Sequence, residues 1–238
     1  GRVSVRRPSG GAGVERSSGP IRVAPAIVGT VAAIAPLDVR LLGRVELTVG
    51  GHEIRLGSRS AQALVAVLAL RPRTRTREAV AAEIWPDGDG GGTSASLRQA
   101  LWVVRSAFAS AGIHIDTYLE IDQEVIGLRP SARPTIDVVR FEACLREHPS
   151  RPEDAIELYR GDLVECLSLE CFAFERERLS DAYEDALALV AERRFLAGDA
   201  EGARDAAETL LARDPLREEA HAALLRVHGR IGSRAQVV

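Results

Sequence analysis

The sequence predicts a mixed fold, in which an α+β domain is followed by an all-α domain. Three short runs of alternating polarity begin at Leu37 and are separated by glycines, which is typical of antiparallel strands. Runs with apolar residues at steps of three and four come next and are typical of helices. We therefore expect three parts: a disordered leader at 1–36, the α+β domain at 37–130 and the all-α domain at 131–238.

The α+β domain is expected to open with three strands and two helices. The runs LDVRLL, VELTV and HEIRL form a small antiparallel sheet, in which Gly50-Gly51 supports a tight hairpin. A helix begins after Ser58, a residue type preferred at N-caps, and ends before Pro72. A second helix begins after Thr76 and closes at Trp85-Pro86.

A third helix and a hairpin complete this domain. The helix follows the loop DGDGGGT, with Thr93 or Ser94 as its expected cap, and the pieces YLEI and VIGL pair around a turn at Asp122. A sheet, three helices and a hairpin are the plan of a winged helix-turn-helix domain. In that plan the third helix enters the major groove of DNA and the hairpin is the wing.

The third helix, SLRQALWVVRSAF, carries an unusual stripe. Its apolar residues recur at steps of three and four, which gathers them on one buried face: Leu97, Leu101, Val104 and Phe108. Arg98, Trp102 and Arg105 then share the opposite face. A large ring left in water forgoes its burial energy, so we expect a partner to dock on this stripe.

Charge is unevenly distributed along the chain. All 31 basic residues are arginine, so a Walker-type phosphate loop and a Schiff-base enzyme, which both need lysine, are excluded. The net charge is +4 over 1–36, +3 over 37–110 and −10 over 111–238. A polyanionic partner is therefore expected to meet the first half.

Other features favour a reduced, cytoplasmic protein that is not an enzyme. The 3 cysteines lack paired spacing, so neither a disulfide framework nor a zinc site is expected. The leader's apolar stretch is too short to span a bilayer. His221 and His228 lie too far apart for one metal ion, and no nucleophile, base and orienting group converge, so no metal or cofactor is expected. Met is absent and the chain begins with Gly1, which suggests a truncated or processed segment rather than a whole open reading frame.

The all-α domain shows a repeat spacing. Gly198-Asp199 and Gly232-Ser233 lie 34 residues apart, and Asp214-Pro215 stands midway between two helices. A helix-turn-helix period of 34 residues is typical of tetratricopeptide repeats, which present a groove to partners. An unrelated helical bundle with a chance spacing is the alternative.

Several separated motifs resemble one family in the expected order. The line LDVRLLGRVELTVGGHEIRLGSRSAQALVAVLAL, then EIWPD and SASLRQALWVVRSAF, resembles the winged-helix DNA-binding domain of SARP bacterial transcriptional activators. IDVVRFEACL, ELYRGDLVE, FERERL and ARDPLREEAHAALLRVHG resemble the bacterial transcriptional activator domain that follows it. The resemblance implies binding to direct repeats in double-stranded promoter DNA, contact with RNA polymerase through the loop at 85–93, and a homo-oligomer on DNA.

The residues expected to contact DNA lie on the stripe and at helix starts. Arginine grips guanine or phosphate in two-point fashion, glutamine can read adenine, and helix amino termini favour phosphate. The full set is Arg98, Gln99, Trp102, Arg105, Thr93, Ser94, Ser96, Arg59, Arg75 and Arg77, with Arg73 in the same basic loop. Members of the family usually carry a basic residue where this sequence has Val103, which weakens the expected grip.

A second function stays open at this point. The weaker DNA contact implied by Val103 is compatible with a protein-protein interaction module of a larger signalling protein. The two functions are separated by selection from random DNA, because only an activator enriches a repeated motif.

Overall fold

All the described helices and strands belong to one part of the chain. The computed structural model describes residues 1–2, 4, 34–88 and 90–235. It divides the chain into two units, 1–33 and 34–238, and the described elements lie in the second. The expected disordered leader therefore lies almost entirely outside the described residues. Its last residues join the fold, since Tyr118 Oη donates to the Ala35 carbonyl at 3.0 Å and the Gly50 amide donates to the Pro36 carbonyl at 2.8 Å.

Two small sheets frame the first half. The four-stranded sheet has the order β3-β2-β1-β7, from β1 (Leu37–Arg40), β2 (Glu46–Val49), β3 (His52–Glu53) and β7 (Thr135–Ile136). The three-stranded sheet has the order β4-β6-β5, from β4 (Arg75–Thr76), β5 (Leu119–Ile121) and β6 (Val125–Leu128). The first three strands and the β5–β6 hairpin were expected. The strands β4 and β7 were not, because a run of two residues has no periodicity to detect.

Three helices of the first half pack on one another, and two of them begin as expected. They are α1 (Arg59–Leu70), α2 (Arg77–Ile84) and α3 (Gly90–Ser110). The Ser58 hydroxyl accepts from the Ala61 amide at 3.1 Å, and the Thr76 hydroxyl accepts from the Ala79 amide at 3.2 Å. The buried side chains of α1 then lie against α3, which confirms the expected winged-helix plan.

Loss of the Ser58 cap should be measurable. Replacing Ser58 with alanine leaves the Ala61 amide without its acceptor, so we expect the free energy of unfolding to fall by about 1 kcal/mol. Urea unfolding followed by circular dichroism measures this change. Ser60→Ala is the matched control because Ser60 lies inside α1, where alanine is favoured. Equal midpoints for the two variants would contradict the role of Ser58.

The start of α3 was predicted wrongly. The helix begins at Gly90 rather than after Thr93 or Ser94, so Gly90, Gly91 and Gly92 form its first turn. Thr93 is 8% exposed and lies within the helix. Glycine is disfavoured in helix interiors, which is why the sequence pattern placed these residues in the loop. Here the three glycines lie at the N-terminal end of α3, and the later turns of this helix are stabilised by packing against α1 and α2.

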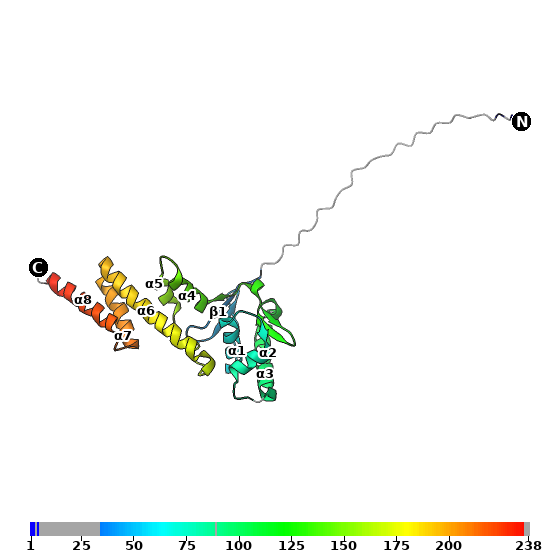
Figure 1. The fold of residues 1–238 in the computed structure, drawn as a ribbon, viewed down its shortest axis with the longest axis horizontal. Coiled ribbons are helices and arrows are strands. Elements are labelled where there is room, and N and C mark those ends of the chain that lie inside the picture. The colour runs from blue at the N-terminus through cyan, green and yellow to red at the C-terminus, as the bar shows by residue number, and fades with distance from the viewer. Residues whose placement is uncertain (3, 5–33, 89, 236–238) are drawn as a thin grey trace. The chain divides into compact units, whose positions relative to one another are not determined.

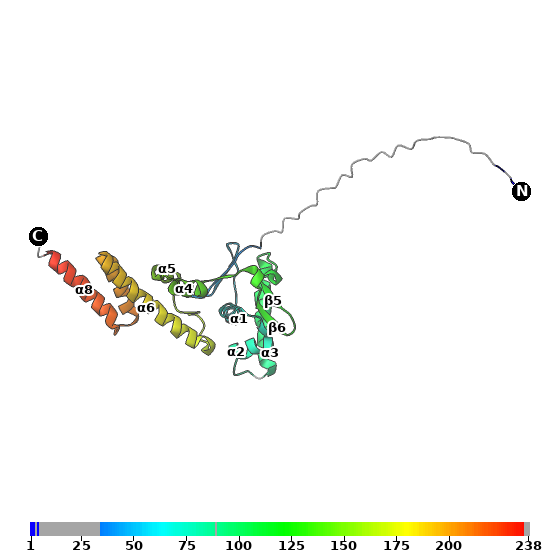
Figure 2. The same cartoon turned by 45° about the horizontal axis from the view of Figure 1, so that its top comes forward.

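The second half is helical, as expected. Its helices are α4 (Asp137–Arg146), α5 (Pro152–Leu158), α6 (Ala173–Ala197), α7 (Ala200–Arg213) and α8 (Glu218–Ala235). Short 3-10 helices lie at η1 (Ile115–Thr117), η2 (Pro130–Ala132) and η3 (Glu170–Phe172). Helices α6, α7 and α8 lie side by side in chain order in Figures 1 and 2.

One of the two expected repeat turns is present. Gly198 has a φ of 88°, a left-handed conformation that glycine adopts readily, and it ends α6. The Asp199 carboxylate accepts from the Gly202 amide at 2.9 Å and so caps α7. The turn expected at Gly232-Ser233 is wrong, because α8 continues through Ala235. A glycine ends a helix only where the chain adopts the left-handed conformation, and the spacing alone did not show this.

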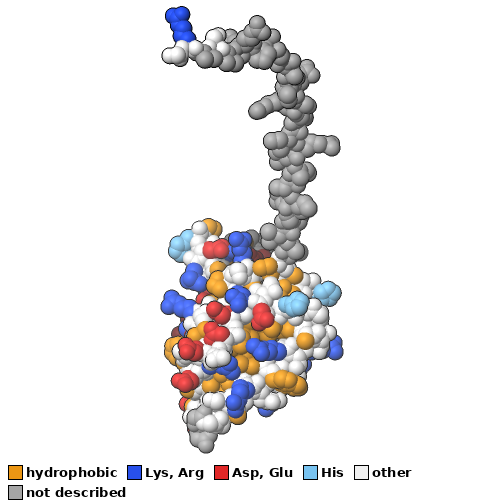
Figure 3. All heavy atoms as spheres, turned by 90° about the vertical axis from the view of Figure 1, so that its right-hand side faces the viewer, with side chains coloured by type: hydrophobic (Ala, Val, Ile, Leu, Met, Phe, Trp, Pro, Cys, Tyr) orange, Lys and Arg blue, Asp and Glu red, His pale blue; other side chains and the backbone are white. Residues whose placement is uncertain are grey.

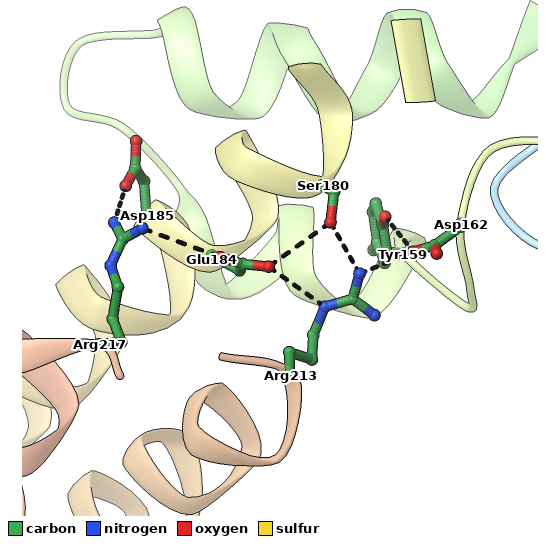
Figure 4. Close-up of polar contacts among 7 residues, drawn as sticks. All are labelled: Tyr159, Asp162, Ser180, Glu184, Asp185, Arg213 and Arg217. Atoms are coloured by element: carbon green, nitrogen blue, oxygen red, sulfur yellow. Dashed lines mark hydrogen bonds and ion pairs between the residues drawn. The ribbon is translucent and has the colours of Figure 1, made fainter. Parts of the chain in front are cut away.

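A polar network holds the helices of the second half together (Figure 4). Arg213, at the end of α7, donates to Asp162 at 2.6 Å and to the Ser180 hydroxyl at 2.8 Å. Tyr159 donates to the same Asp162 carboxylate at 2.9 Å and stacks on Tyr183 with ring centroids 4.1 Å apart. Burial raises the pKa of the Tyr159 hydroxyl, with Asp162 adding to the rise. We assign this cluster to helix packing.

The two halves are joined by more than the chain connection. Strand β7 pairs in parallel with β1, although it follows the expected boundary at residue 130. The carboxylate of Asp137, which is 7% exposed, accepts from the amides of Leu41, Leu42 and Val138 at 2.8–2.9 Å. Burial raises the pKa of Asp137, and the three amides oppose that rise. This carboxylate therefore ties the first helix of the second half to the end of β1.

Candidate nucleic-acid interface

Helix α3 presents two different faces. Leu97, Leu101, Val104 and Phe108 are all buried, which confirms the expected apolar face. The helix ends at Ser110, Gly112 follows with a φ of 71°, and the Ile113 amide donates back to the Phe108 carbonyl at 3.0 Å. Because the apolar face is buried in the core, the opposite face of α3 points away from it.

The stripe lies on that opposite face. Arg98 and Arg105 are exposed, and 63% of Trp102 is accessible to solvent. Neither guanidinium group forms an ion pair or a hydrogen bond with any described residue. Figure 3 shows the side of the molecule that carries α3 and the hairpin, where arginine side chains lie among apolar and acidic ones. The stripe therefore offers two guanidinium groups and an indole ring to a partner.

The other expected contacts on α3 differ in accessibility. Gln99 and Ser94 are exposed, Ser96 is half-buried and Thr93 is buried. Ser94 and Thr93 already have interactions within the chain. Gln99 is therefore the polar residue best placed to extend the stripe.

Two of the expected phosphate anchors are already engaged within the fold. Arg75 donates to Glu83 at 2.6 Å, and Arg71 pairs with the same carboxylate at 3.2 Å. Arg77 donates to the carbonyl of Asp122 in the hairpin turn at 2.9 Å. Glu83 had not been singled out from the sequence, because its partners lie eight and twelve residues away and meet it only through the turn before α2.

Two further arginines of the first half remain accessible. Arg73 is exposed and forms no ion pair within the part of the chain that the structure describes. Arg59 is exposed at the start of α1 and lines a cavity with Trp85 and Leu169. Arg59 thus lies beside the second half as well as at a helix start.

The wing is acidic at its tip. Glu120, Asp122 and Glu124 lie on or next to the turn between β5 and β6. The Asp122 carboxylate accepts from the amides of Glu124 at 2.8 Å and Val125 at 2.7 Å. These amide bonds lower the pKa of Asp122, and the Arg77 charge adds to the effect. A carboxylate-bearing tip repels phosphate, whereas α3 exposes the cationic side chains of Arg98 and Arg105.

Acid should loosen this turn. Because the pKa of Asp122 in the folded state lies below its usual 3.8, the ionised carboxylate stabilises the turn above that usual value. The stabilisation is lost as pH falls through the lowered pKa. We expect the amide resonances of Glu124 and Val125 to shift in that acidic range, as followed by NMR titration. In Asp122→Asn, which lacks the titrating group, the same resonances should stay unchanged; a shift there would exclude Asp122 as the cause.

Val103 packs inward more than its sequence position suggested. It is partly buried and contacts the core, next to the exposed Trp102. A basic side chain at position 103 would therefore have to extend along the helix surface to reach a partner. Having valine instead of a basic residue at position 103 therefore removes less exposed surface than the same change would at the exposed position 102.

Comparisons with known proteins agree with this architecture. Residues 139–237 match the family model of the bacterial transcriptional activator domain. The structure of Mycobacterium tuberculosis EmbR in complex with a low affinity phosphopeptide is similar, with a TM-score of 0.65 and 22% identity. The likeness covers 81% of this chain and 54% of that chain, so this chain spans about half of the EmbR structure. None of the curated proteins compared matches it.

At 22% identity, the likeness to EmbR shows that the two chains share a fold. The match to the family model of the bacterial transcriptional activator domain lies in the second half of the chain. No described helix is long and apolar enough to cross a membrane. No group of three or more potential metal ligands occurs among residues 34–88 and 90–235. Residues 139–237 thus match the bacterial transcriptional activator domain, and they follow a winged-helix domain in a fold similar to that of EmbR.

Proposed function

We propose that this protein is a sequence-specific DNA-binding transcriptional activator of the cytoplasm, with its winged helix at 37–130 and its activator domain at 131–238. Helix α3 enters the major groove. The observation that carries the proposal is the stripe of Arg98, Trp102 and Arg105, which is exposed on the helix that a winged-helix domain presents to DNA. Neither guanidinium is used within the described part of the fold.

The stripe residues divide by chemistry. In the major groove, Arg98 can pair with guanine O6 and N7, and the next residue, Gln99, can pair with adenine. Trp102, between the two arginines, can pack on sugar and on thymine methyl groups. Arg73 and the amino terminus of α2 can grip the phosphate backbone beside the groove.

We also propose that RNA polymerase docks on the loop between α2 and α3. Trp85 is half-buried and packs on the core, while Pro86, Asp87 and Gly88 are exposed. The loop and residues 168–171 of the second half line one cavity of about 620 Å³. A partner bound to this loop would therefore also meet the activator domain.

Selection from random double-stranded DNA with the purified chain tests the proposal. We expect enrichment of a motif that occurs as a direct repeat, and a complex with more than one copy of the protein on the full site. The control is the same selection with Arg98→Ala and Arg105→Ala combined. Equal, salt-labile binding to all sequences would reject sequence-specific activation.

A second function is favoured by one specific observation. Arg71, Arg75 and Arg77 are engaged within the fold, and the wing tip is acidic, so the cationic surface is smaller than the sequence suggests. These features fit a protein-protein interaction module with weakened DNA binding. Random-DNA selection that yields no motif, together with unaltered salt dependence in the stripe variants, would favour this module.

A further inference from the structure

A polar cavity of about 190 Å³ lies where the four-stranded sheet meets the second half. Three side chains in a row across the sheet line it: Asp38 of β1 stands opposite Thr48 of β2 and opposite Thr135 of β7. Leu37 and Val39 on either side of Asp38 are buried, so this row projects from the opposite face of the strand. The sheet thus gives the cavity one carboxylate and two hydroxyl groups.

Three arginines from different segments also line the cavity. Arg40 is the last residue of β1, Arg140 lies in α4, and Arg160 lies just after α5. Arg40 pairs with Glu46 at 3.2 Å. Arg140 and Arg160 are exposed, and their guanidinium groups form no ion pair or hydrogen bond with any described residue. Two guanidinium groups are therefore available to a ligand.

The carboxylates in the cavity have different roles. Asp137 lines it too, but both of its oxygens accept from backbone amides. Asp38 is half-buried, and its carboxylate accepts no hydrogen bond from any described side chain or amide. A carboxylate in that position is an acceptor for hydroxyl groups, and the neighbouring threonines both donate and accept.

We propose that this cavity binds a small phosphorylated polyol of the sugar-phosphate class. The guanidinium groups of Arg140 and Arg160 hold the phosphate, because their planar forks match its oxygens. Asp38, Thr48 and Thr135 hold the hydroxyl groups. The cavity is smaller than the roughly 300 Å³ at which sites for drug-sized ligands begin, which favours a ligand of one sugar ring.

The site is independent of the proposed DNA contacts. None of the lining residues comes from α1, α2, α3 or the β5–β6 hairpin. It is formed by both halves of the chain, so an occupied cavity adds contacts between them. Ligand binding and DNA binding are therefore measurable separately on the full chain.

Calorimetric titration and thermal unfolding of the full chain test the site, with glucose 6-phosphate, inorganic phosphate and glucose as ligands. We expect saturable binding of glucose 6-phosphate with a rise in Tm, weaker binding of phosphate and none of glucose. Sodium chloride at matched ionic strength is the salt control. No saturable binding of glucose 6-phosphate, or equal effects of all three ligands, would overturn the proposal.

Variants assign the binding to this cavity. Arg140→Gln and Arg160→Gln should each weaken glucose 6-phosphate binding about tenfold, the loss expected for one charge-assisted hydrogen bond. Their Tm without ligand should match that of the wild type, because neither arginine has a partner to lose. Arg55→Gln is the control, since Arg55 is exposed beside the same sheet and outside the cavity. Equal affinities in all three variants would place any binding elsewhere.

One more substitution separates the sugar from the phosphate contacts. Asp38→Asn removes a negative charge, so it should strengthen binding of inorganic phosphate. It should also reduce the preference for glucose 6-phosphate over phosphate, because the acceptor for hydroxyl groups is weakened. An unchanged preference would reject the polyol part of the proposal. If duplex DNA competes with inorganic phosphate and glucose 6-phosphate does not, the cavity is instead a site that contacts the phosphates of DNA.

Discussion

Replacing Asp137 with alanine should lower the free energy of unfolding by about 3 kcal/mol, because three buried backbone amides lose a charged acceptor at once. The loss falls at the junction of the two halves, where Leu41 and Leu42 continue from β1 and Asp137 opens α4. Urea unfolding at neutral pH measures it. We expect a single transition at a lower midpoint if both halves still unfold together.

Two controls make the Asp137 result specific. Asp181→Ala removes an exposed carboxylate of α6 and should change the stability by less than about 0.5 kcal/mol. Asp137→Asn keeps one acceptor oxygen and should fall between the wild type and Asp137→Ala. If Asp137→Ala and Asp181→Ala unfold at the same midpoint, the carboxylate does not hold the two halves together.

Replacing Arg98 with alanine should weaken binding to the selected DNA site by about 1–3 kcal/mol and relax the preference at one base pair, if Arg98 contacts a base. If Arg105 contacts a phosphate, Arg105→Ala should weaken binding to all sequences alike. It should also reduce the slope of log affinity against log salt by about one unit, since one fewer counterion is released. Fluorescence titrations at several salt concentrations separate the two effects.

Trp102→Ala distinguishes DNA contact from packing. Since 63% of this side chain is exposed, we expect lower DNA affinity with an unchanged Tm. A lower Tm would assign Trp102 to packing. Val103→Arg complements this variant: it should strengthen DNA binding only if the new side chain reaches past the partly buried position of Val103. Wild-type affinity in both Arg98→Ala and Arg105→Ala would show that the stripe is not a recognition surface.

The elements that the sequence predicted are those with strong local signals. Ser58 and Thr76 were recognisable as caps, and both accept from the amide three residues ahead. The apolar spacing of α3 determined which of its residues are buried, and hence that Trp102 is exposed. These properties depend on neighbours within a few residues, so a pattern along the chain suffices to predict them.

Other features depend on contacts that close only when distant segments meet. The start of α3 at Gly90 and the continuation of α8 past Gly232 depart from glycine's usual preference, which tertiary packing can override. The pairing of β7 with β1 joins residues about a hundred positions apart, and a two-residue strand has no pattern of its own.

The sequence by itself determined the order of the first three strands, the three helices and the hairpin, the arginine-only cation set and the face that α3 exposes. Only the tertiary structure decided which arginine side chains are free of partners within the fold and so accessible to another molecule. Glu83 engages Arg71 and Arg75, and the hairpin carbonyl of Asp122 engages Arg77, whereas Arg98 and Arg105 stay accessible. The physical reason is that a side chain's charge is fixed by its type, but its partners are fixed by distances that only the folded chain sets.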